Sequence, residues 1–158
     1  MSEFRQNIAT GEWVIVATER RKRPDDYARN ALSGQRPLAH EVHRADCPFC
    51  TGNEHQCLPA VWEESAEQKW LLRVVPNIFA AVSTQNHPHR ERVGLHLKTN
   101  GYGRAEVIIE TPTHNADLAF MSVEQIERIL RAYRVRYEDH AQDPHIRMIH
   151  IFRNYGGS

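Results

Sequence analysis

The sequence lacks the features of several large classes of protein. It contains only three cysteines, an odd number that is too small for the disulfide scaffold of a secreted domain. Its longest apolar runs, residues 13–17 and 78–82, are far shorter than a membrane span. Residues 1–7 include no apolar signal segment. We therefore expect a cytoplasmic protein that has no membrane partner.

An excess of one charge is also absent. Lys and Arg total 20 and Asp and Glu total 20, so the formal net charge is zero. This balance excludes nucleic-acid binding driven by overall charge, because such binding relies on a strongly basic surface. The apolar fraction of 41% and the charged fraction of 25% are typical of a folded domain. The length of 158 residues predicts a single domain over 1–158.

Hydrophobic periodicity predicts several strands and one long helix. Short apolar runs predict strands over residues 13–17, 71–75, 78–82 and 105–110. The helix is expected over residues 122–140, where Ser122 and Gln125 form a capping-box pattern before an apolar residue at every third or fourth position. Alternation predicts a final strand over residues 145–153, whereas the polar residues 83–102 are expected to form a loop.

Cys47 and Cys50 form a Cys-x-x-Cys pair that includes a proline. Two thiolates at this spacing can reach one tetrahedral metal ion, and such a pair is half of a typical zinc site. A redox dithiol is one alternative, although the strand–helix pattern that usually surrounds a redox pair is missing here. Two buried structural cysteines are the other alternative. We favour the metal site.

The remaining metal ligands are sought among ten histidines. His114 follows the predicted strand over 105–110, where a turn can aim an imidazole at a fixed point. His55 is the competing ligand because it lies closer to the cysteine pair in sequence. Cys57, the third thiol, is expected to be a bystander.

Three further segments carry side chains that suit a phosphate or nucleotide ligand. A basic run from Arg20 to Arg23 follows the strand over 13–17, and guanidinium groups match phosphate oxygens two at a time. A solvated loop is the alternative interpretation of this run. Asn77 lies between two predicted strands, where a buried amide needs partners that a ligand can supply. Asn154 opens a segment whose glycines let a phosphate approach the backbone.

Six segments share one order with the members of a known family. They are Thr-Gly-Glu-Trp-Val-Ile-Val at 10–16, Arg-Arg-Lys-Arg-Pro at 20–24, Cys-Pro-Phe-Cys at 47–50, Arg-Val-Val-Pro-Asn-Ile-Phe-Ala-Ala at 73–81, Glu-Val-Ile-Ile-Glu-Thr-Pro-Thr-His-Asn at 106–115 and Phe-Arg-Asn-Tyr-Gly at 152–156. Together they cover nearly the whole chain, which resembles the galactose-1-phosphate uridylyltransferase family of the histidine-triad superfamily. The resemblance implies an α+β fold: a histidine-triad-like antiparallel half-barrel sheet, incomplete at the C-terminus, with one main helix over about 122–140.

The resemblance also implies a reaction. Enzymes of this family transfer UMP between UDP-glucose and a hexose 1-phosphate such as galactose 1-phosphate, in galactose metabolism, through a uridylylated histidine. An ADP-sugar phosphorylase-like nucleotidyltransferase on the same scaffold is an alternative, and a non-catalytic, zinc-stabilised nucleotide-binding module is another. Complete enzymes of the family are typically dimeric, so we expect a homodimer.

Site residues follow from the resemblance position by position. Cys47, Cys50 and His114 match the ligands of a Zn²⁺ ion. The other matches are substrate contacts: the phosphate contacts Arg20 and Arg23, the uridine-binding residues Asn77 and Phe79, and Asn154 at the start of the active-site glycine loop. The resemblance therefore implies that these residues bind substrate or metal and that none of them is the nucleophile.

The family's nucleophile is the second histidine of a His-Pro-His-x-Gln motif, and the first is the fourth zinc ligand. We expect this motif beyond Ser158. His87-Pro-His89 is not a substitute, because it precedes the predicted helix and lacks the following glutamine. We therefore expect residues 1–158 to form the N-terminal half of a uridylyltransferase-like enzyme, without a catalytic residue and inactive alone.

Overall fold

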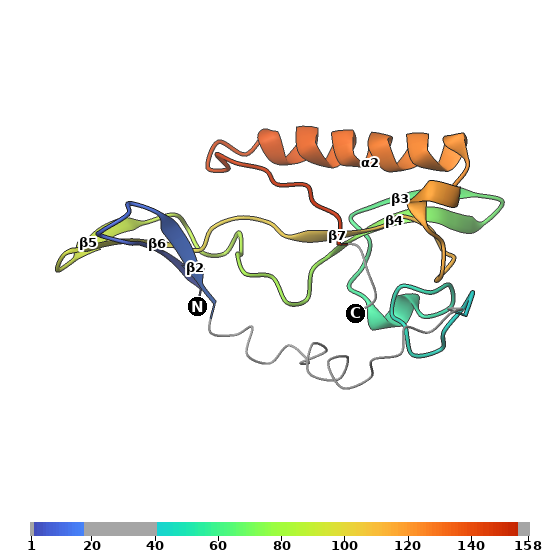
Figure 1. Cartoon of the computed structure of the whole chain (residues 1–158), viewed down its shortest axis with the longest axis horizontal. Helices are drawn as coiled ribbons and strands as arrows, with labels where there is room; N and C mark the ends of the chain where they lie inside the picture. Colours follow the sequence, from blue (N-terminus) through green and yellow to red (C-terminus); the bar gives the residue numbers. More distant parts are fainter. Residues whose placement is uncertain (1, 18–40, 155–158) are drawn as a thin grey trace.

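The computed structural model describes residues 2–17 and 41–154. Within them the chain forms two antiparallel sheets and one long helix (Figure 1). In chain order the elements are β1 (Glu3–Gln6), β2 (Trp13–Val16), the 3-10 helix η2 (Glu54–Gln56), β3 (Trp62–Ala66), β4 (Lys69–Pro76), β5 (Arg90–Val93), β6 (His96–Asn100), β7 (Glu106–Ile109), the 3-10 helix η3 (Leu118–Phe120) and α2 (Val123–Ala141). One sheet has the order β2-β1-β6-β5 and the other β3-β4-β7. The predicted α+β class with antiparallel strands is confirmed.

Strand β4 lies in the middle of the three-stranded sheet and pairs with β3 and β7. Leu72 and Val74 are completely buried and form a cluster with Ile129 and Ala132 of α2. Figure 1 shows α2 running along one face of this sheet. The next residue of the strand, Val75, belongs to a second buried cluster. Strand β4 therefore has a buried face on both sides.

A bulge in β4 determines which way a large side chain points. The register with β3 skips Leu71, so that this residue has no partner opposite it. An extra residue reverses the alternation of side chains along a strand. Trp70 therefore leaves the face of Leu72 and packs with Val75 and Ile109 in the second cluster.

The helix α2 begins where the sequence predicts. The hydroxyl of Ser122 accepts a hydrogen bond from the backbone N–H of Gln125 at 3.2 Å, as an N-cap residue does. The predicted apolar face is correct in part. Ile129 and Tyr133 pack against the sheet, whereas Leu130 is 59% exposed.

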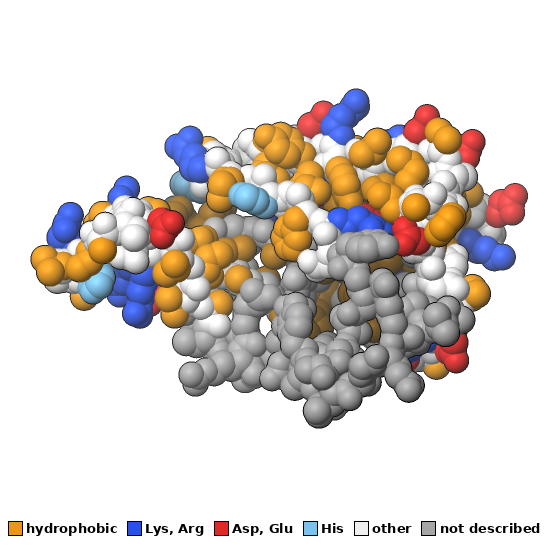
Figure 2. All heavy atoms as spheres, viewed as in Figure 1, with side chains coloured by type: hydrophobic (Ala, Val, Ile, Leu, Met, Phe, Trp, Pro, Cys, Tyr) orange, Lys and Arg blue, Asp and Glu red, His pale blue; other side chains and the backbone are white. Residues whose placement is uncertain are grey.

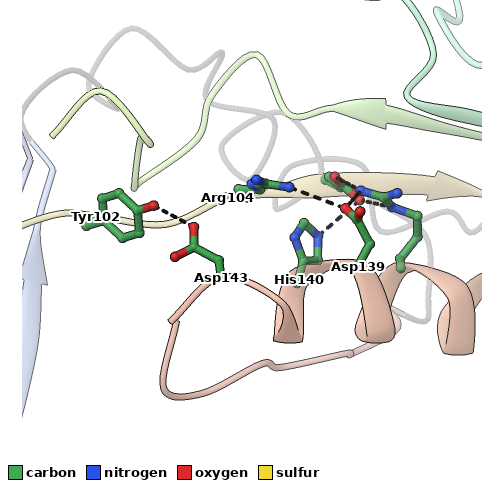
Figure 3. A network of polar contacts seen from close by, with 7 residues as sticks. Tyr102, Arg104, Asp139, His140 and Asp143 are labelled. Carbon is green, nitrogen blue, oxygen red and sulfur yellow. Dashed lines mark hydrogen bonds and ion pairs between the residues drawn. The ribbon is translucent and has the colours of Figure 1, made fainter. Parts of the chain in front are cut away.

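Three polar pairs hold the C-terminal end of α2 beside the segment that leads into β7 (Figure 3). Hydrogen bonds of 2.5 to 3.2 Å join Tyr102 to Asp143, Arg104 to Asp139, and Arg136 to Glu106. Residues 102, 104 and 106 alternate, so all three face the helix. The hydrogen bond from the Tyr102 hydroxyl holds the pKa of Asp143 below its ordinary value.

The carboxylate of Glu110 anchors the segment that follows α2. It accepts hydrogen bonds from the Tyr133 hydroxyl at 2.6 Å and from the Arg153 guanidinium at 2.9 Å. Burial and the hydrogen bond to Glu110 raise the pKa of Tyr133.

A hollow of about 290 Å³ lies beside Glu110, Tyr133 and Arg153, and Figure 2 shows apolar side chains on this part of the surface. Its apolar lining comes from η3, α2 and the anchored segment: Leu118, Ile126, Ile129, Leu130, Ile151 and Phe152.

The four-stranded sheet corrects one prediction. Residues 83–102 are not a loop, because they contain β5 and β6, which pair as a hairpin. Gly94, with a φ of 61°, takes the first position of the two-residue connection, where a positive φ is favoured. All four residues of β5 are exposed, so no apolar alternation marks the strand in the sequence.

Two predicted strands are wrong. The chain turns at Asn77, whose side-chain oxygen accepts the backbone N–H of Phe79 at 2.8 Å, so β4 ends and residues 78–82 do not form a strand. Residues 145–153 pair with no strand in the described part of the chain. Their alternation was misleading, because a strand is defined by the backbone hydrogen bonds of a neighbour.

The buried cluster between β4 and α2 predicts a difference between two leucines. Leu72→Ala should lower the free energy of unfolding by about 2–5 kcal/mol, because it leaves a cavity in the core. Leu130→Ala, a matched change at an exposed site, should cost less than about 1 kcal/mol. Urea unfolding measures both values. Equal losses would contradict this description of the core.

Candidate metal centre

Cys47, Cys50 and His114 come together although they lie far apart in the sequence. One ligand atom from each residue lies within 4.8 Å of the others. The Sγ of Cys50 lies 3.4 Å from Nδ1 of His114. Cys50 is buried, and the other two residues are half-buried. Two thiolates and an imidazole are donors that zinc favours, so these residues fit a zinc ion.

Tight turns build the loop that carries the two cysteines. The backbone N–H of Cys47 donates to the carbonyl of Arg44 at 3.3 Å, and that of Cys50 donates to the carbonyl of Cys47 at 3.2 Å. The backbone N–H of Arg44 in turn points to Sγ of Cys50 at 3.4 Å. Gly52 follows with a φ of 91°, a conformation that favours glycine. The fold of this loop therefore directs both sulfurs to one point.

The position of His114 follows from the strand before it. Strand β7 pairs with β4 up to Ile109, and a short turn then leads to the histidine. The side chain of Thr111 accepts the backbone N–H of Thr113 at 3.2 Å within that turn. The backbone N–H of His114 donates to the carbonyl of Val42 at 2.9 Å, just before the cysteine loop. Backbone contacts therefore place the imidazole beside the sulfurs.

The bulge in β4 fixes the other side of the cysteine loop. The indole N–H of Trp70 donates to the Glu54 carboxylate at 2.6 Å, and the same oxygen accepts the backbone N–H of Gly52 at 3.0 Å. Burial acts to raise the pKa of Glu54, but these hydrogen bonds outweigh it and the pKa lies below its ordinary value. The Arg73 guanidinium lies 5.8 Å from the centre of the Trp70 ring. The sheet therefore supports the loop through a partly buried polar contact.

The other cysteine and the competing histidines lie outside this cluster. Cys57 donates its thiol hydrogen to a backbone carbonyl of the loop at 3.2 Å, and burial raises the pKa of its thiol. His55 is exposed and does not join the cluster. His87 packs edge-on against the ring of His145 at 5.3 Å, and His89 is exposed in the segment before β5.

Three of the five predicted substrate contacts lie in the described part of the chain. Arg20 and Arg23 lie outside the described residues. Asn77 and Phe79 lie at the end of β4, and the amide oxygen of Asn77 has its partner within the chain. Asn154 is exposed at the end of the described segment. Of the predicted site residues that the structure describes, those brought together are the three metal ligands.

Sequence reasoning missed one residue of the cluster's surroundings. Asn53 is buried beside the loop, and its amide donates to the carbonyls of Arg44 and Cys47. Its position three residues after Cys50 could have identified it from the sequence. A small amide side chain at that distance can fold back onto the turn that precedes it.

Residues 1–158 match the family described as "Galactose-1-phosphate uridyl transferase, N-terminal domain". The chain belongs to this family. It is 31% identical over 159 residues to an ADP-glucose phosphorylase of Arabidopsis thaliana, covering 99% of this chain and 44% of the relative. It is 27% identical over 157 residues to the galactose-1-phosphate uridylyltransferase of Thermotoga maritima, covering 99% and 42%. This chain therefore spans less than half the length of either relative.

Solved structures agree with this assignment. The crystal structure of an ADP-glucose phosphorylase from Arabidopsis thaliana with bound ADP-glucose aligns with a TM-score of 0.52 and 29% identity, over 91% of this chain and 39% of that one. A uridylyltransferase structure aligns with a TM-score of 0.55 and 27% identity, over 87% and 35%. The family resemblance seen in the six sequence segments is confirmed. None of the described helices is both long and apolar enough to cross a membrane.

The cluster predicts a specific pattern of metal content. Elemental analysis of the purified protein should find about one zinc per chain, and Cys47→Ser or His114→Ala should lose it. Cys57→Ser is the matched control, and it should keep the metal because Cys57 lies outside the cluster. Zinc that remains in Cys47→Ser, or is lost equally in Cys57→Ser, would contradict the assignment.

Proposed function

We propose that this chain is the N-terminal half of a zinc-stabilised nucleotidyltransferase that acts on nucleotide sugars and sugar phosphates. The observation that carries the proposal is the Cys47–Cys50–His114 cluster within a chain that matches the family over 1–158. Zinc, when bound, supplies a cross-link between the cysteine loop and the end of β7. The protein's own residues would hold it through two thiolates and one imidazole.

The proposed reaction is UMP transfer between UDP-glucose and a hexose 1-phosphate such as galactose 1-phosphate, within galactose metabolism in the cytoplasm. A histidine nitrogen attacks the phosphorus of the UMP group, and glucose 1-phosphate leaves. A phosphate oxygen of the second sugar phosphate then attacks the same phosphorus and frees the histidine. In the sequence, His87-Pro-His89 is followed by Arg90 and Glu91, so the motif of the nucleophile is not matched there. We assign no catalytic residue in 1–158 and propose that these residues alone give no turnover.

Substrate binding is assigned to groups whose chemistry suits a nucleotide sugar. Arg20 and Arg23 are proposed to neutralise and hold the two phosphates, because guanidinium groups donate to phosphate oxygens in pairs. Asn77 and Phe79 are proposed to contact the base, since an amide can pair with it and a ring can stack on it. Asn154 is proposed to open the loop beside the phosphates.

Two further proposals concern the sheet and the subunit assembly of the complete enzyme. We propose that the β3-β4-β7 sheet belongs to a histidine-triad-like half-barrel in the complete enzyme. In support, β7 pairs on one side with β4, and no strand in the described part of the chain pairs with its other edge. An open edge accepts a further strand. We also propose that the enzyme is a homodimer.

One observation favours a second substrate. The Arabidopsis ADP-glucose phosphorylase is 31% identical to this chain, and the Thermotoga uridylyltransferase is 27% identical. In this alternative the chain binds ADP-glucose in place of UDP-glucose. The choice between the bases would depend on the surroundings of Asn77 and Phe79, because these residues are proposed to contact the base.

Isothermal titration with UDP-glucose and ADP-glucose tests both candidates. We expect tighter binding of UDP-glucose, and Arg23→Ala should weaken it roughly 10- to 100-fold, because a hydrogen bond to a charged group contributes about 1.5–3 kcal/mol. Arg134→Ala is the control, since Arg134 is an exposed residue of α2 paired with Glu138. Tighter binding of ADP-glucose would favour the second candidate. If neither nucleotide sugar bound, both would be wrong.

A further inference from the structure

Asn53 lies in the loop that carries the two cysteine ligands, and its side chain bonds to the backbone of that loop. It is only 9% exposed. Its amide nitrogen donates to the carbonyl of Arg44 at 2.9 Å and to the carbonyl of Cys47 at 2.7 Å. An asparagine amide has two hydrogens to donate, so both are used within this loop.

The backbone of Asn53 closes the loop from the other side. Its N–H donates to the carbonyl of Cys50 at 3.1 Å, and its carbonyl accepts the N–H of Gln56 at 2.9 Å. Asn53 thus bonds to the carbonyl groups of both cysteine ligands. It also holds the carbonyl of Arg44, the residue whose N–H points to the sulfur of Cys50. These contacts are with the ligand-bearing backbone itself.

We propose that Asn53 is a positioning residue of the metal centre, which fixes Cys47 and Cys50 in ligand geometry before the ion binds. This inference rests on the proposed zinc site. If a loop becomes ordered only when the metal binds, it loses conformational entropy on binding. Its affinity for the metal is then lower than that of a loop that is already ordered. Removing groups that orient metal ligands typically weakens binding 10- to 100-fold. The hydrogen bonds of the Asn53 side chain go to backbone carbonyls, so its effect passes through the backbone of the cysteine loop.

A matched asparagine is available elsewhere in the fold. The amide of Asn86 also donates to a backbone carbonyl, that of Gly101, at 3.2 Å. Gly101 directly follows β6 of the four-stranded sheet, and neither residue belongs to the metal cluster. Asn86→Ala therefore removes the same kind of hydrogen bond without touching the cysteine loop.

The test is a titration of the metal-free, reduced protein with Co²⁺, which reports thiolate ligands by a charge-transfer absorption band. The variants are Asn53→Ala and Asn53→Leu, the second of which fills the space without donating. Both should bind Co²⁺ about 10- to 100-fold more weakly than the parent protein and show altered cobalt absorption. Asn86→Ala should bind like the parent. Far-ultraviolet circular dichroism of the protein, whose helical signal includes α2, verifies that each variant is folded.

The other outcomes separate the proposed metal site from the proposed positioning role of Asn53. If the parent protein binds Co²⁺ and the Asn53 variants bind it equally well, the positioning role is wrong and the metal site stands. If the parent binds neither Co²⁺ nor zinc, both proposals are wrong. If both Asn53 variants fail to fold even with saturating zinc, Asn53 supports the fold in general, and that result also overturns a specific positioning role.

Discussion

The burial of β4 on both faces is the constraint on which the packing of α2 and the support of the metal cluster depend. One face holds α2 through Leu72 and Val74. The bulge at Leu71 reverses the alternation, so that Trp70 points to the opposite face and donates its indole hydrogen to Glu54 beside the cysteine loop. A strand that packs on both sides has little freedom to shift its register, because a shift by one residue would exchange the two faces.

The metal cluster is joined to this strand from two directions. On one side the partly buried hydrogen bond between Trp70 and Glu54 supports the cysteine loop. On the other side β7 pairs with β4 and leads directly to His114. Cys50 and His114 are 64 positions apart, and β3 to β7 lie between them. An ion held by both would therefore close a long segment of chain, and a link across a long segment removes much of the entropy of the unfolded state.

The sequence predicted the features that local signals encode. These include the N-cap of α2 at Ser122 and the strand that became β7. The match of His114 with Cys47 and Cys50 came from the family resemblance, and the structure brings these three side chains together. The sequence did not predict β3, because Glu67 and Gln68 connect β3 to β4 with positive φ angles although neither is a glycine or an asparagine. The bulge at Leu71 lies within a mostly apolar run of residues, where no sequence pattern marks it. The contact between Trp70 and the cysteine loop therefore could not be predicted from the sequence. Strand β5 was missed because all four of its residues are exposed and three of them are charged.

X-ray absorption at the zinc edge of the purified protein tests the central claim, that one ion joins the cysteine loop to the end of β7. The account predicts two sulfur ligands at about 2.3 Å and an imidazole nitrogen at about 2.0–2.1 Å. A shell of oxygen and nitrogen ligands without sulfur would contradict it. In that case Cys47 and Cys50 would not hold the metal, and no ion would join the cysteine loop to His114.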